Sequence, residues 1–298
     1  MAGHMNLNQL RIFHAVARLL SFTRASEELY LTQPGISKHI KELEGYYGTR
    51  LFDRLGKKVV LTQAGEILFR ITKDIFNLID ESRTRIHDLQ GLAGGKLSIG
   101  ASITIGTYIL PKMLVRFRHK YPDVEIAVDI SLSEQVMDKV LDNTLEIGLV
   151  GHLVNDKRLV AKQFKTDQMV LIVSPRHRWA NRRSPVRLQE LIDQPFLLLK
   201  QGSGTRKIVE GLLEKAGFTL MNIIELGNTE GVKKAVEADL GISIVSKRVV
   251  SRELAAALIK PVPLKGLDLR RNFYVVYHKD RYLSEAARAF FKLLEITM

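Results

Sequence analysis

The sequence predicts a multidomain α+β chain made of an N-terminal winged helix-turn-helix, a long linker helix and a C-terminal α/β domain with two lobes. Three observations lead to this prediction. Residues 23–62 hold two short helical patterns joined by a tight connection and followed by a basic hairpin. Residues 66–89 keep a helical spacing without Gly or Pro, and residues 96–294 alternate strand and helix patterns.

The composition suits a globular protein and excludes several other classes. Hydrophobic residues make up 46% of the 298 residues, and no apolar run reaches the roughly 18 residues that a membrane span needs. The opening residues carry no secretion signal, so we expect a cytoplasmic protein without a membrane partner. A second Met at position 5 identifies residues 1–4 as an expected expression scar. The chain has no Cys, which excludes disulfides and thiolate nucleophiles.

The net charge of +13 favours a polyanionic partner. This charge is not concentrated at the N-terminus, because residues 5–90 hold 13 Lys and Arg against 10 Asp and Glu. A prediction of DNA binding therefore depends on the geometry of the motif, with the total charge as weak support.

The first two helices of this motif are predicted by hydrophobic spacing and by a capping residue. Leu10, Phe13 and Val16 recur at three-residue steps, which indicates a supporting first helix. Thr23 is the expected N-cap of a second helix, whose inner face includes Ala25. A short connection then leads to the third helix.

The third helix is predicted to start at Thr32, a favourable N-cap, with Pro34 in its first turn. Ile36, Ile40 and Leu43 lie four and three residues apart and so share one buried stripe. The polar side opposite that stripe is then free to enter the major groove. The alternative is an ordinary solvated helix face.

The candidate DNA contacts lie on that polar side and on the basic tip of the following hairpin. Gln33 and Ser37 are expected to read base edges, because a helix in the major groove contacts bases with its N-terminal residues. The Lys residues of the helix are expected to reach phosphate or guanine, and the hairpin would lie beside the backbone or minor groove. The full set is Thr32, Gln33, Pro34, Ser37, Lys38, Lys41, Arg54, Lys57 and Lys58.

These segments resemble the LysR-type transcriptional regulators. The resemblance lies in Ser21-Phe22-Thr23-Arg24-Ala25, Leu31-Thr32-Gln33-Pro34-Gly35-Ile36-Ser37, Leu51-Phe52-Asp53-Arg54 and Leu61-Thr62-Gln63-Ala64-Gly65-Glu66. It implies that Gln33, Pro34, Ser37, Lys38 and Arg54 contact double-stranded promoter DNA. It further implies modulation of RNA polymerase recruitment. Ser26 departs from the Ala that is usual in the family, which is a conservative change.

The predicted linker helix, residues 64–90, carries a narrow apolar seam that suits pairing with a second copy of the chain. The seam consists of Leu68, Ile71, Ile75, Leu78, Ile79, Ile86 and Leu89. The alternative is packing of this helix against its own DNA-binding module, residues 5–63. The resemblance implies a dimer through this helix and a pairing of dimers into a homotetramer. Residues 91–95, which are rich in Gly, are expected to form a hinge.

Residues 96–298 are predicted to form the two lobes, each a parallel, helix-covered sheet. The first lobe has strands near residues 96–102, 124–130 and 147–150 and helices near 105–119 and 136–141. The second has strands near 169–173, 196–199, 223–226 and 242–245 and helices near 207–216 and 232–238. The resemblance implies that residues 268–298 return to the first lobe (about 96–165), leaving about 166–267 in the second. The result is a clamshell like that of periplasmic binding proteins.

A small-molecule effector is expected between these lobes, because ligands of open α/β sheets bind where the strands end and the helices begin. Hydroxyl side chains stand at several such positions: Ser102, Thr104, Ser131, Ser133, Ser203, Thr205, Thr229 and Ser246. Together they suit a small anionic metabolite. The alternative for each of them is a simple helix cap.

No enzymatic or metal-binding motif appears in the sequence. Gly202-Ser203-Gly204-Thr205 lacks the ending of a P-loop, and the eight His show no metal-ligand spacing. We therefore expect no catalytic activity, no cofactor and no metal. The alternative is a solute-binding or enzymatic α/β protein with an accessory DNA-binding module. A solute-binding protein by itself would not explain residues 5–65, and an enzyme would require a nucleophile with its base or a cofactor motif, neither of which the sequence shows.

Overall fold

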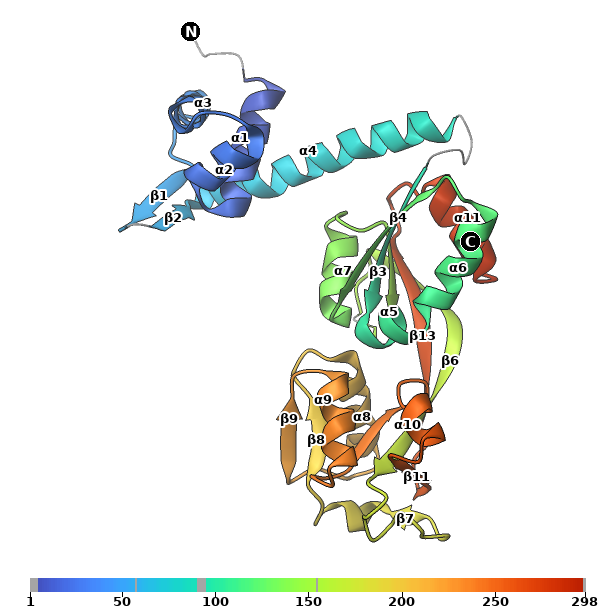
Figure 1. The fold of residues 1–298 in the computed structure, drawn as a ribbon. Helices are drawn as coiled ribbons and strands as arrows, with labels where there is room; N and C mark the ends of the chain where they lie inside the picture. Colours follow the sequence, from blue (N-terminus) through green and yellow to red (C-terminus); the bar gives the residue numbers. More distant parts are fainter. Residues whose placement is uncertain (1–4, 57, 90–94, 154, 297–298) are drawn as a thin grey trace. The chain divides into compact units, whose positions relative to one another are not determined.

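The structure, a computed structural model, describes residues 5–56, 58–89, 95–153 and 155–296 (Figure 1). Lys57, the expected scar and most of the expected hinge lie outside these ranges. The chain divides into two compact units, residues 1–83 and 84–298. None of the described helices has both the length and the apolar character needed to cross a bilayer.

The first unit is a helix-turn-helix with a two-stranded wing (Figure 1). Its elements are α1 (Leu7–Leu19), α2 (Phe22–Leu29), α3 (Gln33–Tyr47), β1 (Phe52–Leu55), β2 (Lys58–Leu61) and the long helix α4 (Gln63–Asp88), which continues into the second unit. The three short helices enclose a core of Ile12, Phe13, Val16, Ala25, Ile36 and Leu43. The predicted stripe on α3 is therefore buried, as its spacing required.

Local hydrogen bonds explain where the helices begin. Thr32 caps α3, since its Oγ1 accepts a hydrogen bond of 3.3 Å from the Gly35 N–H. The predicted cap of the second helix is wrong. Ser21, not Thr23, accepts the bond from Arg24 N–H at 3.2 Å, so α2 begins one residue before Thr23.

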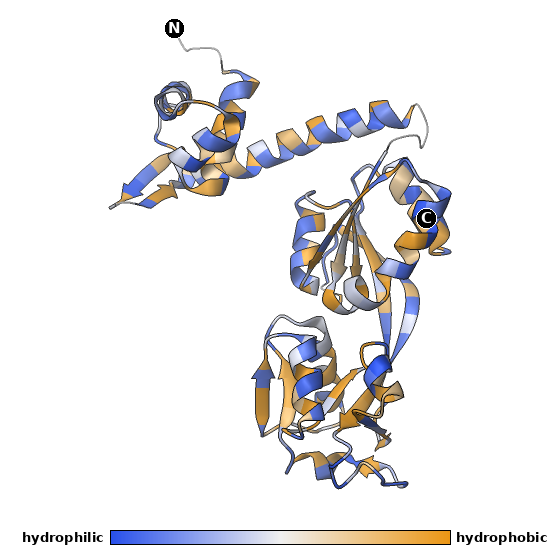
Figure 2. Cartoon of the chain, in the orientation of Figure 1, coloured by the Kyte–Doolittle hydropathy of each residue, from blue (hydrophilic) through white to orange (hydrophobic). Residues whose placement is uncertain are grey.

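The helix α4 is continuous, as predicted, but its apolar residues do not all face the same way. Leu68 is buried and Ile75 packs beside it in the core of the first unit, so the alternative reading holds for these two. Ile71 and Leu78 remain 49% and 56% exposed. Figure 2 shows apolar and polar residues alternating along this helix. Only part of the predicted seam is thus open to a partner.

The second unit contains two lobes with separate cores (Figure 1). The elements of the first lobe are β3 (Lys96–Ser102), α5 (Ile103–Tyr108), α6 (Leu110–Lys120), β4 (Glu125–Ser131), α7 (Ser133–Leu141), β5 (Ile147–Val150), β13 (Arg270–His278) and α11 (Glu285–Leu293). Phe273 and Phe290, from the end of the chain, lie in the same core as Ile99 and Phe117.

The second lobe is built from the intervening residues. Its elements are β7 (Val186–Arg187), the 3-10 helix η1 (Leu188–Leu191), β8 (Phe196–Leu199), α8 (Gly204–Lys215), β9 (Ile223–Leu226), α9 (Thr229–Glu237), β10 (Ser243–Ser246), α10 (Ser251–Ala255), β11 (Lys260–Val262) and β12 (Leu264–Lys265). Its core includes Leu171, Phe196, Leu213 and Ile244.

One strand, β6 (Leu159–Val173), belongs to both lobes. It pairs with β13 in the first lobe and with β10 and β11 in the second, and all three pairings are antiparallel. The resulting sheet has the strand order β10-β6-β13-β5-β3-β4. In Figure 1, β6 and β13 run side by side from one lobe to the other. These two strands form a ribbon that connects the lobes, the connecting ribbon.

Two predictions about the lobes are wrong in part. The sheets are mixed, because β3, β4 and β5 are parallel but β13 and β6 are not. The predicted helix over residues 105–119 is two helices, α5 and α6, which break at Ile109. Pro111 has no N–H and its ring would clash with the preceding turn, so one straight helix cannot continue through it.

Candidate DNA interface and effector pocket

The polar face of α3 is open to solvent. Gln33, Pro34, Lys38 and Lys41 are exposed, and Ser37 is half-buried beside them. The side chains of Gln33, Lys38 and Lys41 make no hydrogen bond or ion pair with another described residue. These groups are therefore free to meet an external partner, while Ile36 and Ile40 hold the other side of the helix in the core.

Hydrogen bonds fix α3 relative to the wing and to the first helix. The Oε1 atom of Glu44 accepts the N–H of Leu51 at 2.8 Å and that of Phe52 at 3.4 Å. Gln9 on α1 donates to Glu42 on α3 at 3.0 Å. These bonds join α3 to α1 and to the start of the wing, and so they fix the orientation of its exposed face.

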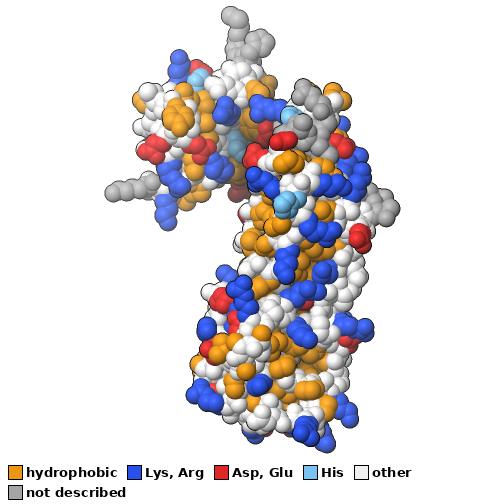
Figure 3. Space-filling view, turned by 45° about the vertical axis from the view of Figure 1, so that its right-hand side comes forward, with side chains coloured by type: hydrophobic (Ala, Val, Ile, Leu, Met, Phe, Trp, Pro, Cys, Tyr) orange, Lys and Arg blue, Asp and Glu red, His pale blue; other side chains and the backbone are white. Residues whose placement is uncertain are grey.

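The wing is a hairpin in which Leu55 pairs with Lys58. Gly56, at its tip, has a φ of +62°, a conformation that favours glycine. Arg54 and Lys58 are exposed, whereas Lys57 lies outside the described residues. Figure 3 shows Lys and Arg side chains projecting from the surface of the first unit. The described cations of the wing are thus accessible to a polyanion.

Helix starts and strand ends from both lobes enclose a pocket in the second unit. Its volume is about 360 Å³, including space that is open to solvent. The pocket is lined by Ser102, Ile103, Thr104, Leu132, Ser133, Gly151, Leu199, Ser203, Gly204, Thr205, Thr229, Arg271 and Phe273. Most of the hydroxyls predicted from the sequence therefore do meet in one place.

Two of the predicted hydroxyls do not line the pocket. Ser131 is the last residue of β4, and its Oγ donates to Asp129 at 2.8 Å. Ser246 is buried and donates to Asp167 at 2.9 Å. Both residues stand at the end of a strand, but their hydroxyls donate to neighbouring carboxylates and do not line the pocket.

The remaining hydroxyls differ in how much of their hydrogen bonding is used. Ser203 accepts the Arg206 N–H at 3.5 Å, so it does act as a helix cap. Ser102, at the N-cap of α5, makes no such bond. Thr229 is not a cap either, because Asn228 caps α9. Within the described ranges, the hydroxyls of Ser102, Thr104, Ser133 and Thr229 form no hydrogen bond, and they are free for a ligand.

Arg271 also lines the pocket, although it is not among the residues predicted from the sequence. Its side chain is 4% exposed. The Nε atom donates to Asp167 at 2.8 Å and Nη1 donates to Thr205 at 3.0 Å, while Nη2 is buried without a hydrogen-bond partner. Burial lowers the pKa of Arg271 and Asp167 opposes this shift, but a guanidinium keeps its charge because its ordinary pKa is so high.

A signal for this burial does exist in the sequence. Arg271, Phe273 and Val275 lie at alternate positions of β13, and alternate residues of a strand share a face. Phe273 and Val275 are fully buried, so the same face carries Arg271 inward. The Arg271 guanidinium also lies over the Phe273 ring, 4.9 Å from its centroid.

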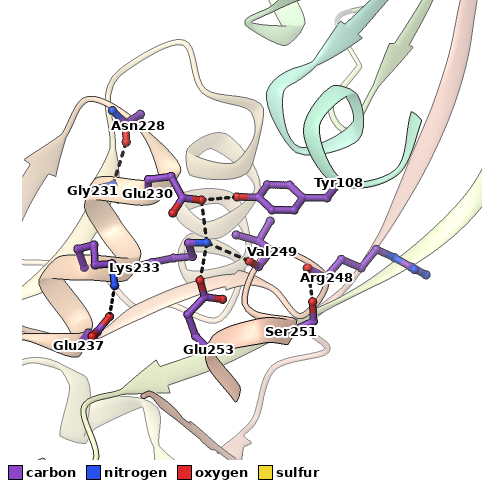
Figure 4. A network of polar contacts seen from close by, with 11 residues as sticks. Tyr108, Asn228, Glu230, Gly231, Lys233, Glu237, Arg248, Val249, Ser251 and Glu253 are labelled. Carbon is purple, nitrogen blue, oxygen red and sulfur yellow. Dashed lines mark hydrogen bonds and ion pairs between the residues drawn. The ribbon is translucent and has the colours of Figure 1, made fainter. Parts of the chain in front are cut away.

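A polar network joins the lobes beside the pocket (Figure 4). Tyr108, at the end of α5, donates to Glu230 on α9 at 2.7 Å. Lys233, whose side chain is 6% exposed, lies 2.7 Å from both Glu230 and Glu253. Burial and the bond to Glu230 raise the pKa of Tyr108 to about 12, so the phenol stays protonated and donates. An ion pair between the lobes joins Glu134 on α7 to Lys207 on α8.

Known proteins match the chain along nearly its whole length. Residues 7–66 match the bacterial regulatory helix-turn-helix of the lysR family, and residues 90–297 match the LysR substrate binding domain. A RuBisCO operon transcriptional regulator of Allochromatium vinosum is 33% identical over 287 residues, which are 96% of this chain and 94% of that protein.

Two solved structures have a similar fold. CbnR in complex with its target DNA has a TM-score of 0.71 at 20% identity, covering 98% of this chain and 99% of that one. The regulatory domain of CcmR from Synechocystis PCC6803, in complex with 2-PG, has a TM-score of 0.62 at 25% identity, covering 67% of this chain and 95% of that one. The chain therefore belongs to the LysR family: it is a DNA-binding transcriptional regulator with an effector-binding domain, rather than an enzyme.

Proposed function

We propose that this regulator reads its operator with the exposed face of α3, and that Gln33 and Ser37 contact base edges. The observation that carries the proposal is the contrast between the two sides of this helix. Ile36, Ile40 and Leu43 are buried, while Gln33, Lys38 and Lys41 are exposed and unpaired among the described residues. CbnR, which shares the fold, is known in complex with its target DNA, and this supports the proposal.

The same proposal assigns a role to each part of the chain. Residues 5–63 bind DNA, residues 64–90 pair with a second copy, and residues 96–298 bind the effector. The exposed Ile71 and Leu78 on α4 support self-association, because exposed apolar groups on a long helix gain by mutual burial. A dimer, and a tetramer formed from two dimers, would bind dyad-symmetric DNA and act on RNA polymerase in the cytoplasm, where a bacterial promoter lies.

A mobility-shift titration on the DNA upstream of the encoding gene tests the DNA-binding part. We expect tighter binding to this fragment than to random duplex of equal length, with an affinity that falls as salt rises. A lack of preference for the upstream fragment at every salt concentration would overturn sequence-specific regulation.

We further propose that the effector is a small metabolite held in the pocket between the lobes. The free hydroxyls of Ser102 and Thr104 support this, as does the complex of the related CcmR domain with 2-PG. Calorimetry with a metabolite panel on the wild type, Ser102→Ala and Thr104→Ala tests it. We expect weaker binding in both variants, since each loses a hydrogen-bonding group. Unchanged affinity in both would place the effector elsewhere.

A further inference from the structure

Arg271 carries a hydrogen-bonding capacity that the folded chain does not use. A guanidinium has five N–H donors in a fixed plane. Those on Nε and Nη1 have partners in Asp167 and Thr205, at 2.8 and 3.0 Å, but Nη2 is buried and has none. A buried donor of a charged group without a partner is costly, so a missing acceptor is expected at this position.

Pairing with Asp167 does not account for the free nitrogen. Asp167 is fully buried and already has several partners: Arg271 at 2.8 Å, Ser246 at 2.9 Å and Arg248 at 3.3 Å. Thr205 meets Nη1 from the second lobe. Both neighbours engage the guanidinium through its other nitrogens, so Nη2 is left for a group that enters the pocket.

The surroundings of Arg271 suit an anion. Of the described residues that line the pocket, Arg271 alone carries a charge, and no carboxylate is among them. The unbonded hydroxyls of Ser102, Thr104 and Ser133 face the same space. The first turn of α8 begins there as well, at Gly204, where N–H groups without helical partners complement negative charge.

We propose that Arg271 is the anchor for an oxyanion, and that the effector is a small molecule with a carboxylate, sulfate-like or phosphate group bound to Nη2. This inference rests on the proposed effector pocket and adds the residue that anchors its ligand and the group on the ligand that this residue holds. One oxygen accepts from Nη2, and the pocket hydroxyls donate to the others. Charge-assisted bonds of this kind are about twice as strong as neutral ones.

The position of Arg271 also connects the ligand to the relation between the lobes. Arg271 on β13 is the registered partner of Asp167 on β6, so both residues belong to the connecting ribbon. Ser102 and Ser133 come from the first lobe and Thr205 from the second. An oxyanion held by this set contacts both lobes and the ribbon between them, and its binding stabilises one arrangement of the three.

Binding of simple anions to the full-length chain tests the proposal. Thermal unfolding and calorimetry are run with sodium phosphate, sulfate and acetate, against sodium chloride at matched ionic strength. The three salts separate phosphate, sulfate and carboxylate as the preferred group. We expect at least one of them to raise the unfolding midpoint of the wild type beyond the effect of chloride, in a concentration-dependent way.

The decisive variant is the double substitution Asp167→Asn with Arg271→Gln, which removes both buried charges together and so avoids leaving one unpaired. Its Kd for the preferred anion should rise roughly tenfold or more. Arg270→Gln is the matched control, because Arg270 is the exposed neighbour on the same strand and pairs with Asp268. It should bind as the wild type does.

Two results would overturn the assignment: no oxyanion in the set stabilises the wild type beyond chloride, or the double variant keeps the wild-type Kd. A Ser102→Ala variant with a raised Kd would add support, and one with an unchanged Kd would overturn the shared set of donors. These measurements contain no DNA, so their failure is separate from a failed mobility shift of the wild type.

Discussion

Positive charge is used in opposite ways by the two units. On α3, Lys38 and Lys41 are exposed and unpaired among the described residues. In the pocket, Arg271 is buried, paired on one side and unpaired on the other. An exposed cation attracts any polyanion and is screened by salt. A buried guanidinium has lost its hydrating water and donates its free N–H only to an acceptor that fits the space beside it. Such a group therefore selects its partner by shape.

Breaking the buried pair should have the largest effect. Arg271→Gln leaves the Asp167 carboxylate, which is fully buried, without its main counter-charge, and it should lower the free energy of unfolding by roughly 3–5 kcal/mol. Urea unfolding measures this. Adding Asp167→Asn should recover part of the loss, and Arg270→Gln should leave the free energy of unfolding close to that of the wild type because its ion pair is exposed. A single variant as stable as the wild type would contradict this account of the pair.

The buried carboxyl group of Glu146 differs from the exposed charges in making the stability of the fold depend on pH. Burial raises the pKa of Glu146 to about 7, despite two hydrogen bonds from Ser284 that lower it. The folded state therefore binds the proton of Glu146 more tightly than the unfolded state does. The resulting stabilisation is fully present below the unfolded pKa of 4.5 and is lost as the pH rises through about 7.

The prediction concerns the difference between Glu146→Gln and the wild type. From pH 5 to pH 8 the wild type should lose on the order of 2 kcal/mol more stability than the variant, because the amide does not titrate. Urea unfolding at each pH measures it, with the exposed Glu125→Gln as control. Parallel pH profiles for Glu146→Gln and the wild type would show that Glu146 ionises normally.

Gln33→Ala tests whether the exposed face reads sequence. Loss of a good base contact should weaken operator binding by about 1–3 kcal/mol and leave binding to random DNA nearly unchanged. Competitive mobility shifts with both duplexes compare the two. Equal losses on both would remove Gln33 from base readout.

Lys58→Ala tests the wing. A lost phosphate contact should weaken all sequences alike and reduce the slope of log K against log salt by about 0.9. Fluorescence anisotropy over a salt series gives the slope. Lys112→Ala is the control, since Lys112 is an exposed cation of the effector-binding domain. A reduced slope in the control, or none in Lys58→Ala, would count against a phosphate contact in the wing.

Tyr108→Phe should have the smallest effect. It removes the 2.7 Å bond to Glu230 but keeps the ring in place, and it should cost about 0.5–1.5 kcal/mol of stability. Urea unfolding of this variant beside Tyr121→Phe, whose ring packs on Phe117, makes the comparison. If both variants lost the same amount, the bond between the lobes would carry no net stability.

The sequence predicts best where the determinant is local. The cap at Thr32 and the stripe of Ile36, Ile40 and Leu43 are set within a few residues, and both are present in the structure. The pocket hydroxyls follow from another simple rule, that helices begin where strands end. Ser131 and Ser246 also stand at strand ends, but their hydroxyls donate to the carboxylates of Asp129 and Asp167. Which partner such a hydroxyl takes depends on side chains that the rule does not consider.

Long-range pairing explains what the sequence did not predict. Asp167 and Arg271 are 104 positions apart, and only the register of β6 and β13 brings them together. The prediction placed the first strand of the second lobe at residues 169–173, whereas β6 begins at Leu159, ten residues earlier. Its first part is polar on one side and lacks a continuous apolar run, so periodicity does not detect it. Without that segment, the partner of Arg271 cannot be inferred.

The connecting ribbon sets the kind of motion that is available to the effector-binding domain. Two lobes joined by flexible loops could swing freely, but β6 and β13 remain hydrogen-bonded to each other from one lobe to the other. Their register shifts once, between Phe273 and Tyr274, two residues from Arg271. A change in the angle between the lobes would therefore have to twist or bend these two hydrogen-bonded strands, whose pairing is irregular close to Arg271. The ribbon thus restricts the lobes to movements that keep this strand pairing intact.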